Sequence, residues 1–86
     1  MYELISVSRG GLTICESFYN TKKEAIDAMV ADMITCCDFE SLDEIVEAAD
    51  RGDAGFSDDE SWAETKDWGT AVWKIIQIPT EIKQEV

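Results

Sequence analysis

The sequence predicts a small α+β domain, in which a three-stranded antiparallel sheet carries two helices on one face in the order β-β-α-α-β. Three observations predict it: two apolar runs separated by a pair of glycines, two capping boxes that each precede a helical pattern, and one apolar run near the C-terminus. A chain of 86 residues has room for one domain, so we expect residues 1–86 to form a single acidic unit.

Two strands are expected first, at residues 2–7 and 12–18, because both segments are rich in apolar and β-branched side chains. Gly10 and Gly11 lie between them. Glycine readily adopts the positive φ angles that tight turns between antiparallel strands require. The start of the chain is therefore predicted to be a β-hairpin.

The first helix is expected to begin after a capping box made of Thr21 and Glu24 and to end at about residue 36. Apolar side chains then recur at helical spacing, at Ile26, Met29, Val30, Met33, Ile34 and Cys37. This periodicity predicts an amphipathic helix that packs on the sheet.

A second capping box, Ser41 with Glu44, predicts another helix that ends at Gly52. Its apolar positions also recur at helical spacing. The expected buried stripe is Leu42, Ile45, Val46 and Ala49.

The last strand is expected at residues 70–78, whose sequence is TAVWKIIQI, with Trp73 in the core. Pro79 closes this strand, because proline cannot donate a hydrogen bond to a neighbouring strand. We expect the strand to pair with the first or the second. Residues 52–61 are expected to form a loop, and the tail 80–86 is expected to be frayed.

The charge of the chain is strongly negative, at −12, and it is unevenly distributed. Residues 38–67 hold twelve acids and two bases, a net charge of −10. Such a field disfavours direct binding to nucleic acid or to an anionic membrane and favours a basic partner. No apolar run approaches the roughly 18 residues of a membrane span, and the first residues lack a basic signal region. We therefore expect a cytoplasmic location.

Enzyme function is disfavoured because the chain has no histidine, which removes the usual general base of serine and cysteine triads. A carboxylate pair of the kind found in glycosidases needs a cleft, and so small a core has little material for its walls. Gly10 and Gly11 also lack the Gly-Lys-Ser/Thr ending of a phosphate loop. We expect no catalytic residue and no cofactor.

A specific metal site is not expected either. A calcium loop that began at Asp50 would have Gly55 at its sixth position, as an EF-hand requires, but three ligand positions hold other residue types. Adventitious binding of divalent ions by Asp58, Asp59 and Glu60 is more plausible than a built site. The three cysteines, Cys15, Cys36 and Cys37, have neither zinc-site spacing nor the even number of a disulfide framework, and one of the adjacent pair is expected in the core.

The second helix carries the most informative pattern, a set of acids at spacings that line one face. Acids three and four residues apart on a helix repel, and each such pair costs about 0.2–0.5 kcal/mol. The acids continue into the following segment, so we expect them to form an acidic ridge that binds a partner together with Trp62. The ridge residues are Glu40, Asp43, Glu44, Glu47, Asp50, Asp53, Asp58, Asp59, Glu60, Glu64 and Asp67. Trp62 and Trp68 pack the segment onto the core or form an exposed interface hot spot; the sequence leaves both open.

The chain resembles a known class of proteins in three features: its size, its acidic stretch at residues 38–67, and the segment SWAETKDWGTAVWKIIQI at residues 61–78. Together they resemble small acidic proteins of phages and mobile elements, in particular anti-CRISPR proteins that act as nucleic-acid mimics. Those proteins share no common fold, so the resemblance implies no topology. It implies that the chain blocks an RNA-guided nuclease, in the cytoplasm of a host cell, where that enzyme grips its target duplex or guide.

The leading hypothesis is a non-enzymatic inhibitor that binds a basic nucleic-acid-binding groove of another protein by imitating phosphate charge. The alternative is a protein-interaction or oligomerisation module that recruits another chain through an open sheet edge at residues 2–7 or 70–78, with acids that serve solubility only. A third hypothesis is ion binding through the loop 50–60. Whether the chain is a monomer or a dimer is left open.

Overall fold

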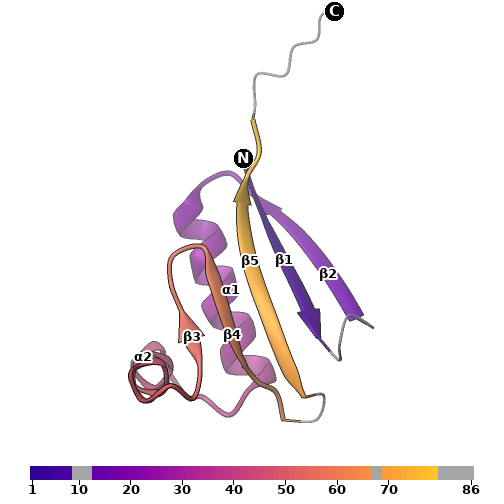
Figure 1. Cartoon of the computed structure of the whole chain (residues 1–86). Coiled ribbons are helices and arrows are strands. Elements are labelled where there is room, and N and C mark those ends of the chain that lie inside the picture. The colour runs from indigo at the N-terminus through magenta and orange to yellow at the C-terminus, as the bar shows by residue number, and fades with distance from the viewer. Residues whose placement is uncertain (9–12, 67–68, 80–86) are drawn as a thin grey trace, which may run out of the picture.

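A computed structural model of the chain describes residues 1–8, 13–66 and 69–79. Its described residues form one five-stranded antiparallel sheet and two helices (Figure 1). The elements in chain order are β1 (Tyr2–Ser8), β2 (Thr13–Tyr19), α1 (Lys22–Cys36), α2 (Leu42–Arg51), β3 (Gly55–Phe56), β4 (Glu60–Glu64) and β5 (Thr70–Gln77). The strand order in the sheet is β2-β1-β5-β4-β3. The α+β class is therefore confirmed, whereas the prediction of three strands is wrong.

Two strands were missed: β3 lies within residues 52–61, where a loop was predicted, and β4 begins in that range and continues to Glu64. In β4, Ser61 and Ala63 are buried and the residues between and beside them are exposed, which is the two-residue alternation of a strand with one face on the core. This alternation spans only five residues and follows a glycine- and aspartate-rich segment. β4 is a strand because β5 supplies its hydrogen-bonding partner, with Trp62 opposite Val72.

The predicted hairpin and the predicted last strand are confirmed. β1 and β2 pair in antiparallel register from Tyr2 opposite Tyr19 to Ser8 opposite Thr13, while the expected glycine turn lies outside the described residues. β5 pairs with the other side of β1, as one of the two predicted pairings requires. It ends before Pro79, and the frayed tail predicted over 80–86 also lies outside the described residues.

Helix α1 begins as predicted. The Thr21 hydroxyl accepts a hydrogen bond from the Glu24 backbone N–H, and the Glu24 carboxylate accepts one from the Thr21 backbone N–H. The helix crosses one face of the sheet (Figure 1) and buries a stripe of side chains against it. The fully buried members are Ala25, Met29 and Met33, followed by Cys37 just after the helix.

Helix α2 lies against β3 at the end of the sheet and differs from the prediction in two details. The Ser41 hydroxyl accepts from the Glu44 N–H, but the Glu44 carboxylate accepts from the N–H of Glu40, so only half of the second capping box forms as predicted. The buried side chains are Ile45 and Ala48, whereas Leu42 and Val46 of the predicted stripe are 43% and 42% exposed. Because its main contact is with a two-residue strand, α2 buries only a narrow stripe of side chains.

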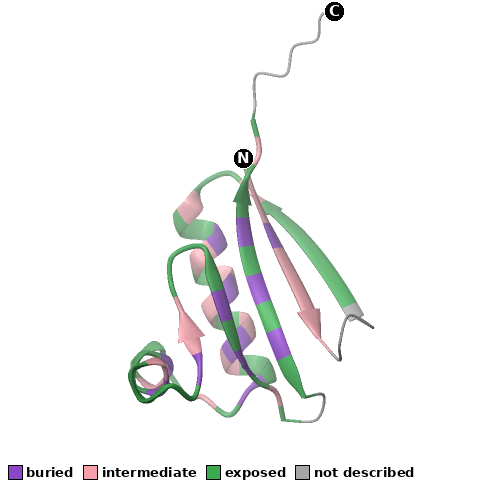
Figure 2. Ribbon diagram, viewed as in Figure 1, coloured by how far each residue is buried: buried purple, intermediate pink, exposed green. Residues whose placement is uncertain are grey.

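The core lies between α1 and the sheet (Figure 2). Trp73 on β5 is 1% exposed, as predicted, and its indole N–H donates a hydrogen bond of 3.0 Å to the Asp32 carboxylate of α1. Leu4 and Ile75 are neighbours on β1 and β5 and are buried on the same side. The opposite face of the sheet carries the alternate side chains of every strand, and several large apolar ones among them are exposed.

Candidate functional site

Four exposed acids on and beside α2 have carboxylates without an ion-pair partner among the described residues, and we call this surface the α2 acidic face. Asp43, Glu47 and Asp50 follow one another at spacings of four and three, on the side of the helix opposite to Ile45 and Ala48. Within the described part of the chain, no ion pair or side-chain hydrogen bond involves these carboxylates. The α2 acidic face consists of Glu40, Asp43, Glu47 and Asp50.

The arrangement of these acids works against the stability of the helix. Asp43 and Glu47 repel, and so do Glu47 and Asp50, at about 0.2–0.5 kcal/mol for each pair. Asp50 also lies in the last turn, where the helix dipole disfavours negative charge. Arg51 is the basic residue of that turn, but its guanidinium pairs with Asp53 at 3.0 Å. Asp43 lies in the first turn, where the dipole favours an acid, so Glu47 and Asp50 are the acids that the stability of the helix does not explain.

The acids of the segment 58–60, after α2, differ from the α2 acidic face because lysines from distant parts of the chain lie close to two of them. Asp58 forms an ion pair of 3.0 Å with Lys22 at the start of α1, and Glu60 lies 3.8 Å from Lys74 on β5. The Asp59 carboxylate accepts a hydrogen bond from the Ser57 hydroxyl. Local sequence patterns could not place these lysines near the ridge, since they are 36 and 14 residues away along the chain.

The remaining members of the predicted ridge lie on the sheet or outside the described residues. Glu64 on β4 accepts a hydrogen bond of 2.6 Å from the Thr70 hydroxyl on β5. Trp62 is 39% exposed on the sheet face opposite α1, so it does not pin the segment to the core between α1 and the sheet. Asp67 and Trp68 lie outside the described residues. The predicted ridge is therefore divided among the α2 acidic face, a partly neutralised loop and the sheet.

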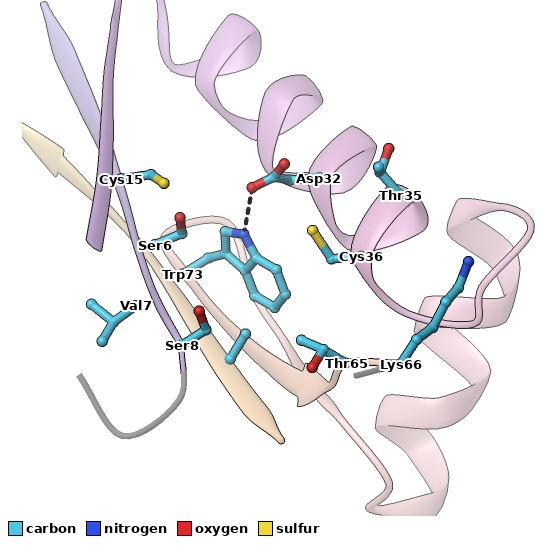
Figure 3. A pocket seen from close by; sticks show the side chains of 11 residues that line it. Ser6, Val7, Ser8, Cys15, Asp32, Thr35, Cys36, Thr65, Lys66 and Trp73 are labelled. Carbon is cyan, nitrogen blue, oxygen red and sulfur yellow. Dashed lines mark hydrogen bonds between the residues drawn. The ribbon is translucent and has the colours of Figure 1, made fainter. Parts of the chain in front are cut away.

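A pocket of about 350 Å³ lies between the last turns of α1 and strands β1, β2 and β5 (Figure 3). Trp73 and Asp32 meet in it, and Cys15 and Cys36 lie on opposite sides of them. Burial, followed by the charge of Asp32, raises the pKa of the Cys36 thiol. A raised pKa lowers the thiolate fraction, and the thiolate is the nucleophile, so Cys36 is a weaker nucleophile at neutral pH than an ordinary cysteine.

All three cysteines are free. Cys37 is the core cysteine that the sequence predicted, at 1% exposure, and burial raises the pKa of its thiol to about 11. Among the residues that the structure describes, no group of three or more histidine, cysteine, aspartate and glutamate side chains is placed to hold a metal ion.

The sheet edge proposed for protein interaction is not where the sequence placed it. Residues 2–7 and 70–78 contain β1 and β5, which have a neighbouring strand on both sides and offer no open edge. The open edges of the sheet are β2 and the two-residue β3. Strand order in a sheet depends on contacts between distant segments, so the local pattern could not reveal it.

Comparison of the chain with protein families, curated proteins and solved structures found no match. None of the helices in the described residues is long and apolar enough to cross a membrane.

Proposed function

We propose that the protein is a non-enzymatic inhibitor that binds a basic nucleic-acid-binding groove of another protein, with the α2 acidic face in place of phosphate groups. The observation that supports this proposal is the set of carboxylates at Glu40, Asp43, Glu47 and Asp50, exposed and without a cation among the described residues. Of the predicted ridge, the proposal assigns binding to the α2 acidic face alone, because Asp58 and Glu60 already have lysines beside them.

The physical basis is charge matching on a regular scaffold. Side chains three and four residues apart on a helix have Cβ atoms about 5–6 Å apart, which is comparable with the spacing of phosphates along a nucleic-acid strand. A groove lined by lysine and arginine relieves the repulsion that these acids exert on one another in the free helix. The counterions that leave the two charged surfaces favour association further.

Leu42 and Val46 add an apolar border to this surface. Both are more than 40% exposed and lie four residues apart, beside the stripe of Asp43 and Glu47. Apolar contact gives a protein partner an attraction that salt does not screen. The target class that we propose is the RNA-guided nucleases, on the resemblance to anti-CRISPR proteins.

The test is a competition experiment with a panel of purified RNA-guided nucleases, each loaded with guide RNA and a fluorescent target duplex. The wild-type protein should displace the duplex from a susceptible enzyme. The triple variant Asp43→Asn, Glu47→Gln, Asp50→Asn should raise the half-inhibitory concentration at least about tenfold, which corresponds to about 1.4 kcal/mol. Doubling the salt concentration should weaken the wild type more than this variant.

A second triple variant, Asp58→Asn, Asp59→Asn, Glu60→Gln, is the matched control, because it changes the net charge by the same amount. Its half-inhibitory concentration should stay within about twofold to threefold of the wild type, since these acids already have partners. Equal losses in the two variants would mean that total charge, not the α2 acidic face, governs inhibition. Absence of displacement from every nuclease in the panel would contradict the target class.

A further inference from the structure

The face of the sheet opposite α1, which we call the open face, carries large apolar side chains on four strands. The strand registers place them on one side, because residues opposite each other in neighbouring strands share a face. The exposed fraction reaches 62% for Ile14 and 55% for Phe18. The large apolar residues of the open face are Ile5, Val7, Ile14, Phe18, Trp62, Val72 and Ile76.

Four of these residues form a continuous row across the sheet. Val7 on β1 lies opposite Ile14 on β2 and opposite Val72 on β5. Val72 in turn lies opposite Trp62 on β4. We call this sequence of neighbours, Ile14–Val7–Val72–Trp62, the apolar row. It contains no polar side chain, which is unusual for a surface that faces water.

The tryptophan at the end of the row is held in place by a glycine on the next strand. Gly55 on β3 lies opposite Trp62, and the indole ring occupies the space that a Cβ atom at Gly55 would fill. The ring therefore lies against the backbone of the edge strand instead of projecting freely. An aromatic side chain that is ordered before binding loses little entropy on binding, and tryptophan is enriched at interface hot spots.

The size of the open face fits an interface. Four strands spaced about 4.8 Å apart, with about 3.3 Å per residue along each, give a surface of roughly 400 Å² in projection. The largest exposed apolar patch of a soluble monomer commonly measures about 300–600 Å² and is often functional. The accessible area of such a corrugated surface is larger than its projection, and a standard interface takes roughly 800 Å² from each partner.

The charges around the apolar row decide which kind of occupant fits. Glu3, Glu16, Glu60 and Glu64 alternate with the apolar residues on this face, and Lys74 is the basic residue among them, for a net charge of −3. A second copy of the chain would bring like charges together. Glu16 also lies in the middle of the open edge strand β2, where a charge opposes edge-to-edge pairing.

We propose that the open face binds a basic amphipathic segment of a partner protein, whose apolar stripe covers the apolar row and whose lysine or arginine side chains meet Glu3, Glu16, Glu60 and Glu64. The partner's cations compensate acids that the sheet leaves with a single lysine. This surface lies on the sheet and does not depend on the role proposed for α2.

The test uses a synthetic amphipathic helix with a stripe of leucines flanked by lysines, titrated into the ¹⁵N-labelled protein. Amide shifts should concentrate in β1, β2, β4 and β5. The double variant Ile14→Thr, Val72→Thr keeps β-branched side chains in both strands and should bind at least about tenfold more weakly. A peptide with glutamates in place of the lysines, and one with serines in place of the leucines, should each bind at least about tenfold more weakly than the original.

The triple variant Asp43→Asn, Glu47→Gln, Asp50→Asn is the control for a general attraction between acid and base, and it should leave the shifts in the sheet unchanged. The proposal is overturned if the shifts map to α2, or if the double variant binds the leucine–lysine peptide as tightly as the wild type. Sedimentation of the protein alone gives a third outcome. A dimer that the double variant dissociates would show that a second copy is the occupant and would overturn the charge argument.

Discussion

Glu3 and Glu16 show how a single pair of residues can oppose folding at neutral pH. They lie diagonally on the neighbouring strands β1 and β2, since Glu3 is opposite Phe18 and Glu16 is opposite Ile5. Burial is the first cause that raises the pKa of the Glu3 carboxyl above its ordinary value, and the negative charge and hydrogen-bonding contact of Glu16 add to it. The folded protein therefore holds the Glu3 proton more tightly than the unfolded chain does.

Glu3→Gln should therefore raise the melting temperature at pH 7. A raised pKa in the folded state means that ionised Glu3 destabilises the fold above that pKa, and that the penalty disappears as the pH falls toward the ordinary glutamate value of 4.5. The difference in melting temperature between the variant and the wild type should shrink over this interval. Melting curves from pH 7 to pH 4.5 measure it, and a difference that grows toward acid pH would contradict the assignment.

At the scale of the element, α2 is a helix whose outer side is not arranged for stability. Its like-charged neighbours oppose the helix, whereas α1 carries a favourable pair four residues apart, Lys23 with Asp27 at 2.9 Å. The two helices of one chain thus provide opposite electrostatic patterns on exposed surfaces. The contrast can be measured as the change in the free energy of unfolding that one substitution in each helix causes.

Glu47→Gln should stabilise the protein, because it removes the repulsion of Glu47 with both Asp43 and Asp50. The expected gain is about 0.2–0.5 kcal/mol for each pair relieved, measured as the free energy of unfolding in urea. Asp27→Asn is the matched control, and it should destabilise by a similar amount for one pair because it breaks the ion pair with Lys23. Loss of stability in Glu47→Gln would show that this carboxylate has a structural partner.

At the scale of the whole molecule, the net charge of −12 on 86 residues opposes the compact state through self-repulsion. The four ion pairs between described residues are exposed, and exposed pairs contribute little to stability. The core of so small a domain is thin, so even a modest electrostatic penalty is a large fraction of the free energy of unfolding. Ionic strength should therefore change the stability of the protein measurably.

Raising sodium chloride from low to physiological concentration should increase the melting temperature, because salt screens repulsion between surface carboxylates. Calcium chloride at equal ionic strength should give about the same increase, since the described residues contain no group of three or more ligands for a metal ion. Calorimetry in the two salts measures both effects. A larger rise with calcium would support ion binding by the 50–60 segment, and a fall with sodium chloride would contradict dominant self-repulsion.

Features that depend on neighbouring residues could be predicted from the sequence alone: the hairpin strands, α1 with its Thr21 capping box, the final strand with Trp73, and the excess of acid. Capping and periodicity act over a few residues, so the printed sequence contains them in full.

Features that depend on contacts between distant segments arise only when the chain folds. β4 is a strand because β5 lies beside it, Asp58 has a cation because α1 begins next to it, and Trp62 is exposed because the helices leave that face of the sheet uncovered. The surface that results is apolar in the middle and acidic around it. Its composition was visible in the sequence, but its continuity was not, since the members of the apolar row come from four strands and become neighbours only when the sheet forms.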